Sequence, residues 1–504
     1  RKDQEKLRNE LSGFQTSLLT EEQKLTLRIL ESLMNTEKKG EGLELYSQPL
    51  APTIGTQAQL PMLLCEYTFY TRQDAEDYLN ILEYLDTRMR YGQILSFEQE
   101  KAKAGLMMSN TSIDHVIESC KSYLLVPGNN FMIDSFKERL RALPDLTEDA
   151  KKELCARNEA ALEKHFVPAY KLLIDGLEKL KNTGTNEKGM CGYPDGKTYY
   201  EYLVYTATGT SYHTIDELMT ATAQEISDNL EITSKLLSEH PELESMLDSY
   251  QYRQTEPTAI MEELKEQTLK DFPQLPECSY TLKDVPKALE LSLSPAFYLT
   301  SPIDDSSQNV IYINKNPIYD NQPLYNTIAH EGYPGHLYQT VWFHNHCSSD
   351  LRKILSFSGY TEGWAAYVEA LSYRLDNGLD PLLGELLEAN SKATLGIHAY
   401  LDLAVNYLGW ERKDVQKYLA SYFSDPESVV DSMFETMVDN PANYLSYFIG
   451  SLEIRNMRET AELQLGDSFD ATAFHTFLLD MGNAPFDVIQ SYFTTWLMNQ
   501  KMGN

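Results

Sequence analysis

A proline between two histidines constrains the fold of this chain more than any other feature. Residues 329–336 read AHEGYPGH, so that His330 and Glu331 are followed by His336. The spacing is two residues longer than in H-E-x-x-H, the motif that binds zinc from one helix. On an unbroken helix, histidines six positions apart would point about 240° apart and could not share an ion. A metal site here therefore requires an interrupted helix.

The residues between the histidines favour such an interruption. Pro334 lacks an N–H and clashes with the carbonyl four positions earlier, which is that of His330. Gly332 and Gly335 give the backbone the freedom to bulge and to start a new helix. We therefore expect His336 to turn back toward His330. The alternative is that both histidines are ordinary loop residues.

An acidic pattern follows in YTEGWAAYVEAL, 26 residues after the second histidine. Glu362 and Glu369 are seven positions apart, which places them about 20° apart on one helix face. A carboxylate among apolar neighbours is costly unless it is paired or binds a metal. We predict that Glu362 is the third metal ligand and that Glu369 supports a ligand histidine. The alternative for both is a solvated helix surface.

This ligand set leaves one position of a tetrahedral zinc ion open, as a catalytic site requires. Glu331, beside a ligand, would take a proton from a zinc-activated water. The segment 440–459 should be helical after its proline and places Tyr447 and Arg458 about 20° apart. We expect Tyr447 to stabilise an oxyanion and Arg458 to bind a substrate carboxylate. A core tyrosine and a surface salt bridge are the alternatives.

Apolar residues at helical spacing predict helices over most of the chain, for example in residues 5–36 and 146–180. The segment 182–197 is rich in Gly, Asn and Lys and is the best candidate for a boundary or an exposed loop. We predict an N-terminal helical part at 1–185 and a catalytic helical part at 186–504, within one mainly α-helical unit.

The proline-rich stretch 272–323 interrupts this helical pattern. Its run VIYI at 310–313 is β-branched and aromatic and ends at Asn314, so we expect a short strand beside the metal motif. As an edge strand, it would line the substrate cleft and pair with a peptide backbone.

Composition excludes several classes of function. The 504 residues include 43 basic and 75 acidic side chains, and the net charge of -32 opposes binding to nucleic acid or anionic lipid. No apolar run approaches the ~18 residues of a membrane helix. The six cysteines are widely spaced and lack a C-x-x-C pair, which disfavours a disulfide framework and a cysteine zinc site.

The remaining histidines carry weaker predictions. His398 and Asp402 are four positions apart on a predicted helix, and we expect them to pair. His344 and His346 follow the metal motif, and we expect them at the rim of the site or on the surface. The other five are expected to be structural: His115, His165, His213, His240 and His475.

The segments AHEGYPGH, TEGWAAYVE, NYLGW and PANYLSYFIG together resemble the bacterial domain-of-unknown-function 885 family, many of whose members are named as lipoproteins. That family is similar to helical zinc peptidases of the thimet oligopeptidase, angiotensin-converting-enzyme and carboxypeptidase Taq type. The resemblance implies a gluzincin-like fold with a deep cleft between helical halves and a glutamate as third ligand. It also implies an extracytoplasmic protein, secreted or anchored by lipid through a leader that this sequence does not include.

The resemblance gives the same roles to the metal motif and to Glu362, and it places Tyr447 and Arg458 in a P-x-Q-x-x-x-Y-x-x-G…R segment. The chain departs from the family pattern at two positions. Asn443 stands where Gln is usual, and Asn406 stands where His is usual. The second departure argues against a transition-state donor from this segment, and it leaves room for altered specificity or lost activity.

We therefore predict a Zn²⁺-dependent metallopeptidase that cuts peptides, of the carboxypeptidase or oligopeptidase type. One alternative is a non-catalytic peptide-binding protein of the cell envelope that keeps the fold. The other is a metal-dependent hydrolase of non-peptide amides. The expected partner is a peptide substrate and not a nucleic acid; the sequence does not predict an oligomeric state.

Overall fold

Helices build most of the molecule. The computed structural model describes residues 2–503 apart from 125–130, 286, 288, 289, 291, 292, 304, 306 and 320–322. In chain order the α-helices are α1 (Lys2–Ser12), α2 (Glu21–Lys39), α3 (Thr56–Glu66), α4 (Arg72–Tyr84), α5 (Arg90–Ala104), α6 (Asn110–Ser122), α7 (Phe131–Arg141), α8 (Glu148–Ala161), α9 (Val167–Leu180), α10 (Gly196–Thr208), α11 (Ile215–Glu239), α12 (Glu242–Leu247), α13 (Pro257–Thr268), α14 (Leu324–Glu331), α15 (His336–His346), α16 (Asp350–Ile354), α17 (Ser358–Ser372), α18 (Pro381–Leu403), α19 (Arg412–Leu419), α20 (Val430–Asp439), α21 (Asn443–Leu465), α22 (Ala471–Met481) and α23 (Phe486–Gly503). The predicted mainly α-helical class is confirmed; the deep cleft stays a prediction.

The N-terminal helices differ in detail from the sequence expectation. The predicted helix at 5–36 is two helices, because Thr20 forms a capping box with Gln23 and starts α2 as a separate element. The predicted helix at 146–180 is confirmed as α8 and α9, and a π-helical turn at Leu162–Phe166 joins them.

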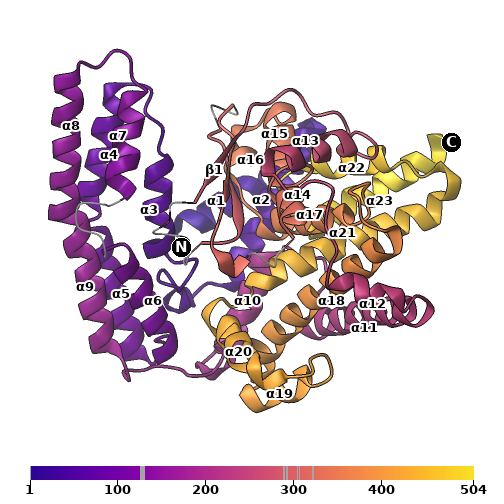
Figure 1. Ribbon diagram of the computed structural model, residues 1–504. Coiled ribbons are helices and arrows are strands. Elements are labelled where there is room, and N and C mark those ends of the chain that lie inside the picture. Colours follow the sequence, from indigo (N-terminus) through magenta and orange to yellow (C-terminus); the bar gives the residue numbers. More distant parts are fainter. Residues whose placement is uncertain are drawn as a thin grey trace.

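Helices α3 to α9 form a group on the left of Figure 1. Their apolar faces share one core, whose largest buried members include Tyr78, Phe136 and Tyr170. Burial of such aromatic side chains is a main source of stability in a helical group of this kind.

The larger body contains α10 to α23. At its centre α17 packs closely against α21, and α11 runs along α18. Helix α2 packs against α10 and α23, where Leu25 and Ile29 share a core with Phe486 and Ile489. Thus α2 belongs with the larger body although it precedes the predicted division at residue 185; that division stays a prediction.

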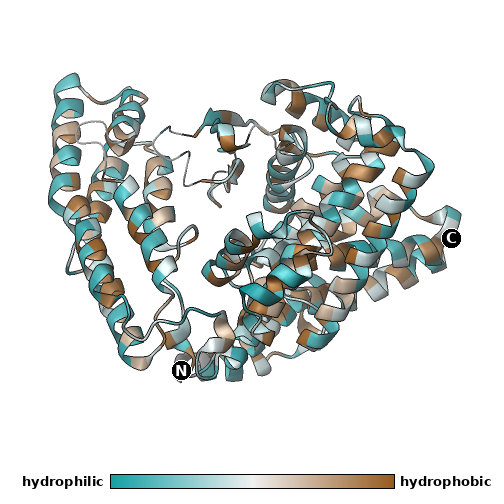
Figure 2. Ribbon diagram, turned by 60° about the horizontal axis from the view of Figure 1, so that its bottom comes forward, coloured by the Kyte–Doolittle hydropathy of each residue, from teal (hydrophilic) through white to brown (hydrophobic). Residues whose placement is uncertain are grey.

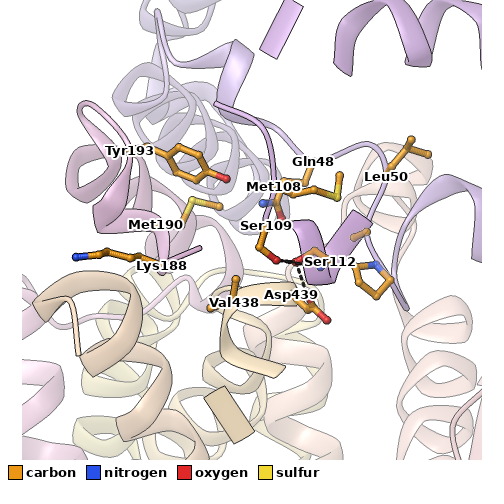
Figure 3. A pocket seen from close by; sticks show the side chains of 12 residues that line it. Gln48, Leu50, Met108, Ser109, Ser112, Lys188, Met190, Tyr193, Val438 and Asp439 are labelled. Carbon is orange, nitrogen blue, oxygen red and sulfur yellow. Dashed lines mark hydrogen bonds between the residues drawn. The ribbon is translucent and has the colours of Figure 1, made fainter. Parts of the chain in front are cut away.

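Polar contacts join the N-terminal group to the larger body. Figure 3 shows Ser109, the N-cap residue of α6, and Ser112 of α6 beside Asp439 at the end of α20. The Ser112 hydroxyl donates to Oδ1 of Asp439, and Nδ1 of His115 lies 2.8 Å from its Oδ2. Because one carboxylate holds two side chains of α6, the two groups of helices are tied together at this point.

A three-stranded sheet lies beside the metal motif. Its order is β1 (Thr281–Asp284), β3 (Val310–Ile313) and β2 (Ala296–Leu299); β3 is parallel to β1 and antiparallel to β2. The predicted strand is therefore confirmed, but its predicted edge position is wrong. Both neighbours of β3 use its backbone hydrogen-bonding groups, which leaves β1 and β2 as the edges.

Hydropathy along the helices follows the pattern of amphipathic elements, with hydrophilic and hydrophobic residues interleaved in Figure 2. Within the described ranges, the helices are too short or too polar to cross a membrane.

Candidate metal centre

The metal motif folds as two helices with a tight turn between them. Helix α14 ends at Glu331, and α15 begins at His336. A Cβ at Gly335 would lie 1.7 Å from the backbone oxygen of His330, so that only glycine permits this approach. The indole N–H of Trp364 donates to the backbone oxygen of Pro334 at 2.8 Å and fixes the turn against α17.

The interruption brings the two imidazoles together. The ring centroids of His330 and His336 are 4.8 Å apart, and the ring planes are inclined at 82°. Ligand atoms of these histidines and of Glu331 all lie within 4.8 Å of one another. The expected return of His336 toward His330 is therefore present in the structure.

Glu362 of α17 faces both rings. Its Oε2 lies 3.3 Å from Nε2 of His336 and 3.6 Å from Nε2 of His330. This oxygen is buried and has no well-aligned hydrogen bond within the described residues. Burial alone would raise the pKa of Glu362, but the two histidines hold it well below its usual value. A buried, charged oxygen without an aligned donor is a candidate metal ligand.

Glu369 lies seven residues, or about two turns, after Glu362 on α17. It accepts from Nδ1 of His330 at 2.9 Å. This contact places a ring proton on Nδ1, so that Nε2 is the nitrogen that faces Glu362 and can bind a metal. Burial alone would lower the pKa of His330, but Glu362 and Glu369 raise it well above its usual value. The acidic surroundings of this histidine thus favour a positive charge, whether a proton or a metal ion.

Glu331 is held from the other side by the sheet. The backbone N–H of Tyr298, on edge strand β2, donates to its Oε2 at 2.7 Å. Burial is the main cause of its pKa being raised above the usual range of a carboxyl. The sequence did not predict this partner, because a backbone donor has no side-chain signature.

Tyr447 reaches the same site from α21. Its ring lies 6.0 Å from that of His330 at 23°, and burial together with Glu362 and Glu331 raises its pKa well above the usual value. Helices α17 and α21 cross at glycines: a Cβ at Gly450 of α21 would lie 1.9 Å from the backbone oxygen of Gly359 of α17. The close crossing therefore sets how near Tyr447 comes to the ligands of α17.

Arg458 is not brought to this site. Its Nη1 donates to the hydroxyl of Tyr367 at 2.8 Å, and its Nε donates to Glu462 at 2.7 Å. Tyr367 in turn contacts Nε2 of the buried His475 at 2.8 Å. Eleven residues of helix separate Arg458 from Tyr447 by about 16 Å along the axis, so a shared face does not mean a shared site.

Residues 1–492 match the family described as "Bacterial protein of unknown function (DUF885)". The chain belongs to this family. This confirms the resemblance read from the sequence. No curated protein matches the chain significantly.

Two solved structures share the fold of this chain. A "putative lipoprotein" from Colwellia psychrerythraea superposes with a TM-score of 0.85 at 20% identity, over 99% of this chain and 90% of that one. A "putative lipoprotein of unknown function" from Shewanella oneidensis gives 0.61 at 15% identity, over 97% and 91%. A "putative oligoendopeptidase F" from Bacillus anthracis gives only 0.33 at 10% identity, over 99% and 97%, which is too slight to support an argument.

In this DUF885 protein, Asn406 forms part of a second buried network. Its Oδ1 accepts from the backbone N–H of Met190 at 2.9 Å, and its Nδ2 donates to Asp402 and to the backbone oxygen of Met437. The expected pair of His398 and Asp402 is wrong: Nδ1 of His398 contacts the backbone oxygen of Thr394 instead. Asp402 is already engaged by long-range donors.

The residues present fit a divalent metal. Two imidazole nitrogens and one carboxylate oxygen without a protein donor converge, which is the donor set of catalytic zinc sites with an open position. The same set also suits other first-row transition metals. The DUF885 chain thus contains a group of His and Glu side chains that could hold a metal ion.

Proposed function

We propose that this protein is a zinc-dependent metallopeptidase that hydrolyses peptides. The observation that carries the proposal is the convergence of His330, His336 and the donorless oxygen of Glu362 next to a second buried carboxylate, Glu331. Zinc in this position would supply a Lewis acid and a water of near-neutral pKa. Three protein ligands and a neighbouring general base are the parts that peptide hydrolysis by this route requires.

The chain's own groups then have separate roles. Glu331 takes the proton of the attacking water, and its raised pKa brings it closer to a working pH near neutrality. Tyr298 holds this carboxylate through its N–H. Tyr447, whose raised pKa keeps its phenol protonated, donates to the oxyanion that develops on the substrate carbonyl. Glu369 keeps the Nδ1 proton on His330.

The edge strand β2 is the surface on which we place the peptide. Its residue Tyr298 contacts Glu331 directly, so a backbone paired with this strand would pass beside the general base. Arg458 is engaged by Tyr367 and Glu462 and is about 16 Å along α21 from Tyr447. For this reason we favour an oligopeptidase over a carboxypeptidase that captures a terminal carboxylate.

The descriptions of the two solved neighbours support a proposal about the localisation of this protein. Both are described as lipoproteins, and we propose that this chain likewise works in the bacterial cell envelope, outside the cytoplasm. Peptides that enter or leave the envelope are then the accessible substrate class. Localisation of the tagged full-length protein by fractionation would contradict this part if the protein were found with the cytoplasmic fraction.

The test is a metal analysis followed by digestion of a peptide library with and without a chelator. We expect about one zinc per chain, cleavage that the chelator abolishes, and a loss of about 10²- to 10⁴-fold in rate for Glu331→Gln with zinc retained. Glu231→Gln, an exposed change of equal charge on α11, is the matched control. Zinc binding without cleavage would contradict the proposal and favour a non-catalytic peptide-binding protein. Cleavage confined to non-peptide amides would favour a metal-dependent hydrolase of such amides.

A further inference from the structure

Two adjoining cavities lie in the larger body on either side of Tyr205 of α10. The first, of about 260 Å³, is bounded by α2, the loop at 209–213 and the start of α23. The second, of about 480 Å³, is bounded by α10, the start of α11 and Tyr407. Lys39, Tyr205 and His213 line both cavities. Taken together, the two cavities fall within the ~300–1,000 Å³ range of small-molecule sites.

The lining carries two carboxylates in each cavity. Glu37 and Asp487 line the first, and Glu201 and Asp216 line the second. None of the four has an ion-pair partner among the residues that the structure describes. Lys39 is the only lysine or arginine in the described lining of either cavity. The cavities therefore hold an excess of negative charge, which disfavours an anionic ligand.

Tyrosines orient these carboxylates and supply apolar walls. The hydroxyl of Tyr407 donates to Oε1 of Glu201 at 2.9 Å, and that of Tyr202 donates to Oε1 of Glu37 at 3.3 Å. The apolar ring faces suit a ligand that carries methylene groups beside its charges, and a bare metal ion has no methylene groups. Burial and the charge of Glu201 raise the pKa of Tyr205, in agreement with a negative potential at its ring.

The chain's own ammonium groups already use two of these rings. Nζ of Lys39 lies 3.7 Å from the ring centroid of Tyr205, and Nζ of Lys197 lies 5.1 Å from that of Tyr407. Contacts at these distances are cation–π interactions. They show, independently of the carboxylates, that the ring faces at this site accept an alkylammonium group.

We propose that the two cavities form one binding site for a linear organic polycation of the polyamine class. One ammonium lies between Glu37 and Asp487, and another lies between Glu201 and Asp216. The methylene chain between them crosses Tyr205. Lys39 competes for the same ring, so it lowers the affinity for the ligand.

The experiment is a calorimetric titration of the full chain with spermidine at physiological ionic strength. We expect saturable binding with one site per chain. Glu37→Gln and Glu201→Gln should each weaken binding by about three- to tenfold, because each removes one of the paired carboxylates. Lys39→Gln should strengthen binding by about threefold, because it frees the ring and removes a like charge.

Glu231→Gln serves again as the control, since it removes an equal charge on the exposed face of α11 outside both cavities. Its affinity should equal that of the wild type. Thermal unfolding of each variant shows that it is folded. Equal weakening by all three glutamate variants would reveal general counterion binding and overturn the proposal, as would an absence of saturable binding or a weaker Lys39→Gln.

Discussion

Two buried polar clusters in the larger body use similar residues for different purposes. In the Asp402 network (Asp402, Asn406, Tyr200 and the backbone of Ala442), Oδ1 of Asp402 accepts from the other three members. Around His330, two Nε2 atoms and Oε2 of Glu362 face one another without an aligned donor. We call the Asp402 cluster closed because three protein donors hold its Oδ1, an arrangement that supports the fold. We call the His330 cluster open because potential ligand atoms of three residues face one another.

The sharpest way to break this comparison is to remove a ligand from the open cluster. Glu362→Gln should lower metal affinity by more than the ~100-fold that loss of an outer hydrogen-bond partner costs at most. The fold should remain, because the change is isosteric. Metal content by plasma mass spectrometry, with Glu231→Gln as control, measures this. Full metal content in Glu362→Gln would exclude this carboxylate as a ligand.

A smaller effect is expected from the residue that only supports a ligand. Glu369→Gln keeps the shape but weakens the acceptor for Nδ1 of His330, and metal affinity should fall by about 10- to 100-fold. Competition with a coloured chelator gives the affinity. A loss as large as that of Glu362→Gln would mean that Glu369 binds the metal itself.

The closed cluster should respond in the opposite way. Asn406→Ala leaves the N–H of Met190 and the backbone oxygen of Met437 without partners, and should lower the free energy of unfolding by about 1–3 kcal/mol. Metal affinity should not change. Urea unfolding compares it with Asn345→Ala, an exposed control expected within about 0.5 kcal/mol of the wild type. A loss of metal in Asn406→Ala would show that the two clusters depend on each other, and would contradict this prediction.

The smallest expected effect concerns pH. Burial raises the pKa of Asp402 to about 7, and its Oδ2 lacks a hydrogen-bond partner in the described structure. A carboxyl with a raised folded-state pKa adds stability below its unfolded value near 3.9, and this is lost as pH rises toward about 7. Relative to Asp402→Asn, the wild type should therefore lose about 1 kcal/mol of unfolding free energy between pH 6 and pH 7.5. Parallel urea midpoints across this range would contradict the shift.

The sequence was informative where local rules act. Pro334 and Gly335 determine the break between α14 and α15, and helical periodicity places Glu362 and Glu369 on the same side of α17. Both effects involve only a few neighbouring residues. The close approach of the two histidines follows from them.

Long-range pairing was not available from the sequence. The central position of β3 depends on β1 and β2, two four-residue strands with little alternation of their own, and Tyr298 contributes a backbone group. Arg458 has the predicted angle around α21, but its rise along the axis carries it to Tyr367. The predicted i,i+4 pair of His398 and Asp402 does not form, because Asp402 accepts from the hydroxyl of Tyr200 and the backbone N–H of Ala442, which are distant in sequence.

The crossing of α17 and α21 has a mechanical consequence. A Cβ at Gly363 would lie 2.4 Å from the backbone carbon of Gly450, so the two main chains touch with no side chain as a spacer. Sliding or tilting of either helix would bring main-chain atoms into collision, so we expect the pair to move as one unit. Motions that admit or release a bound molecule should then involve the elements around this helix pair, and those elements should set the rate of exchange.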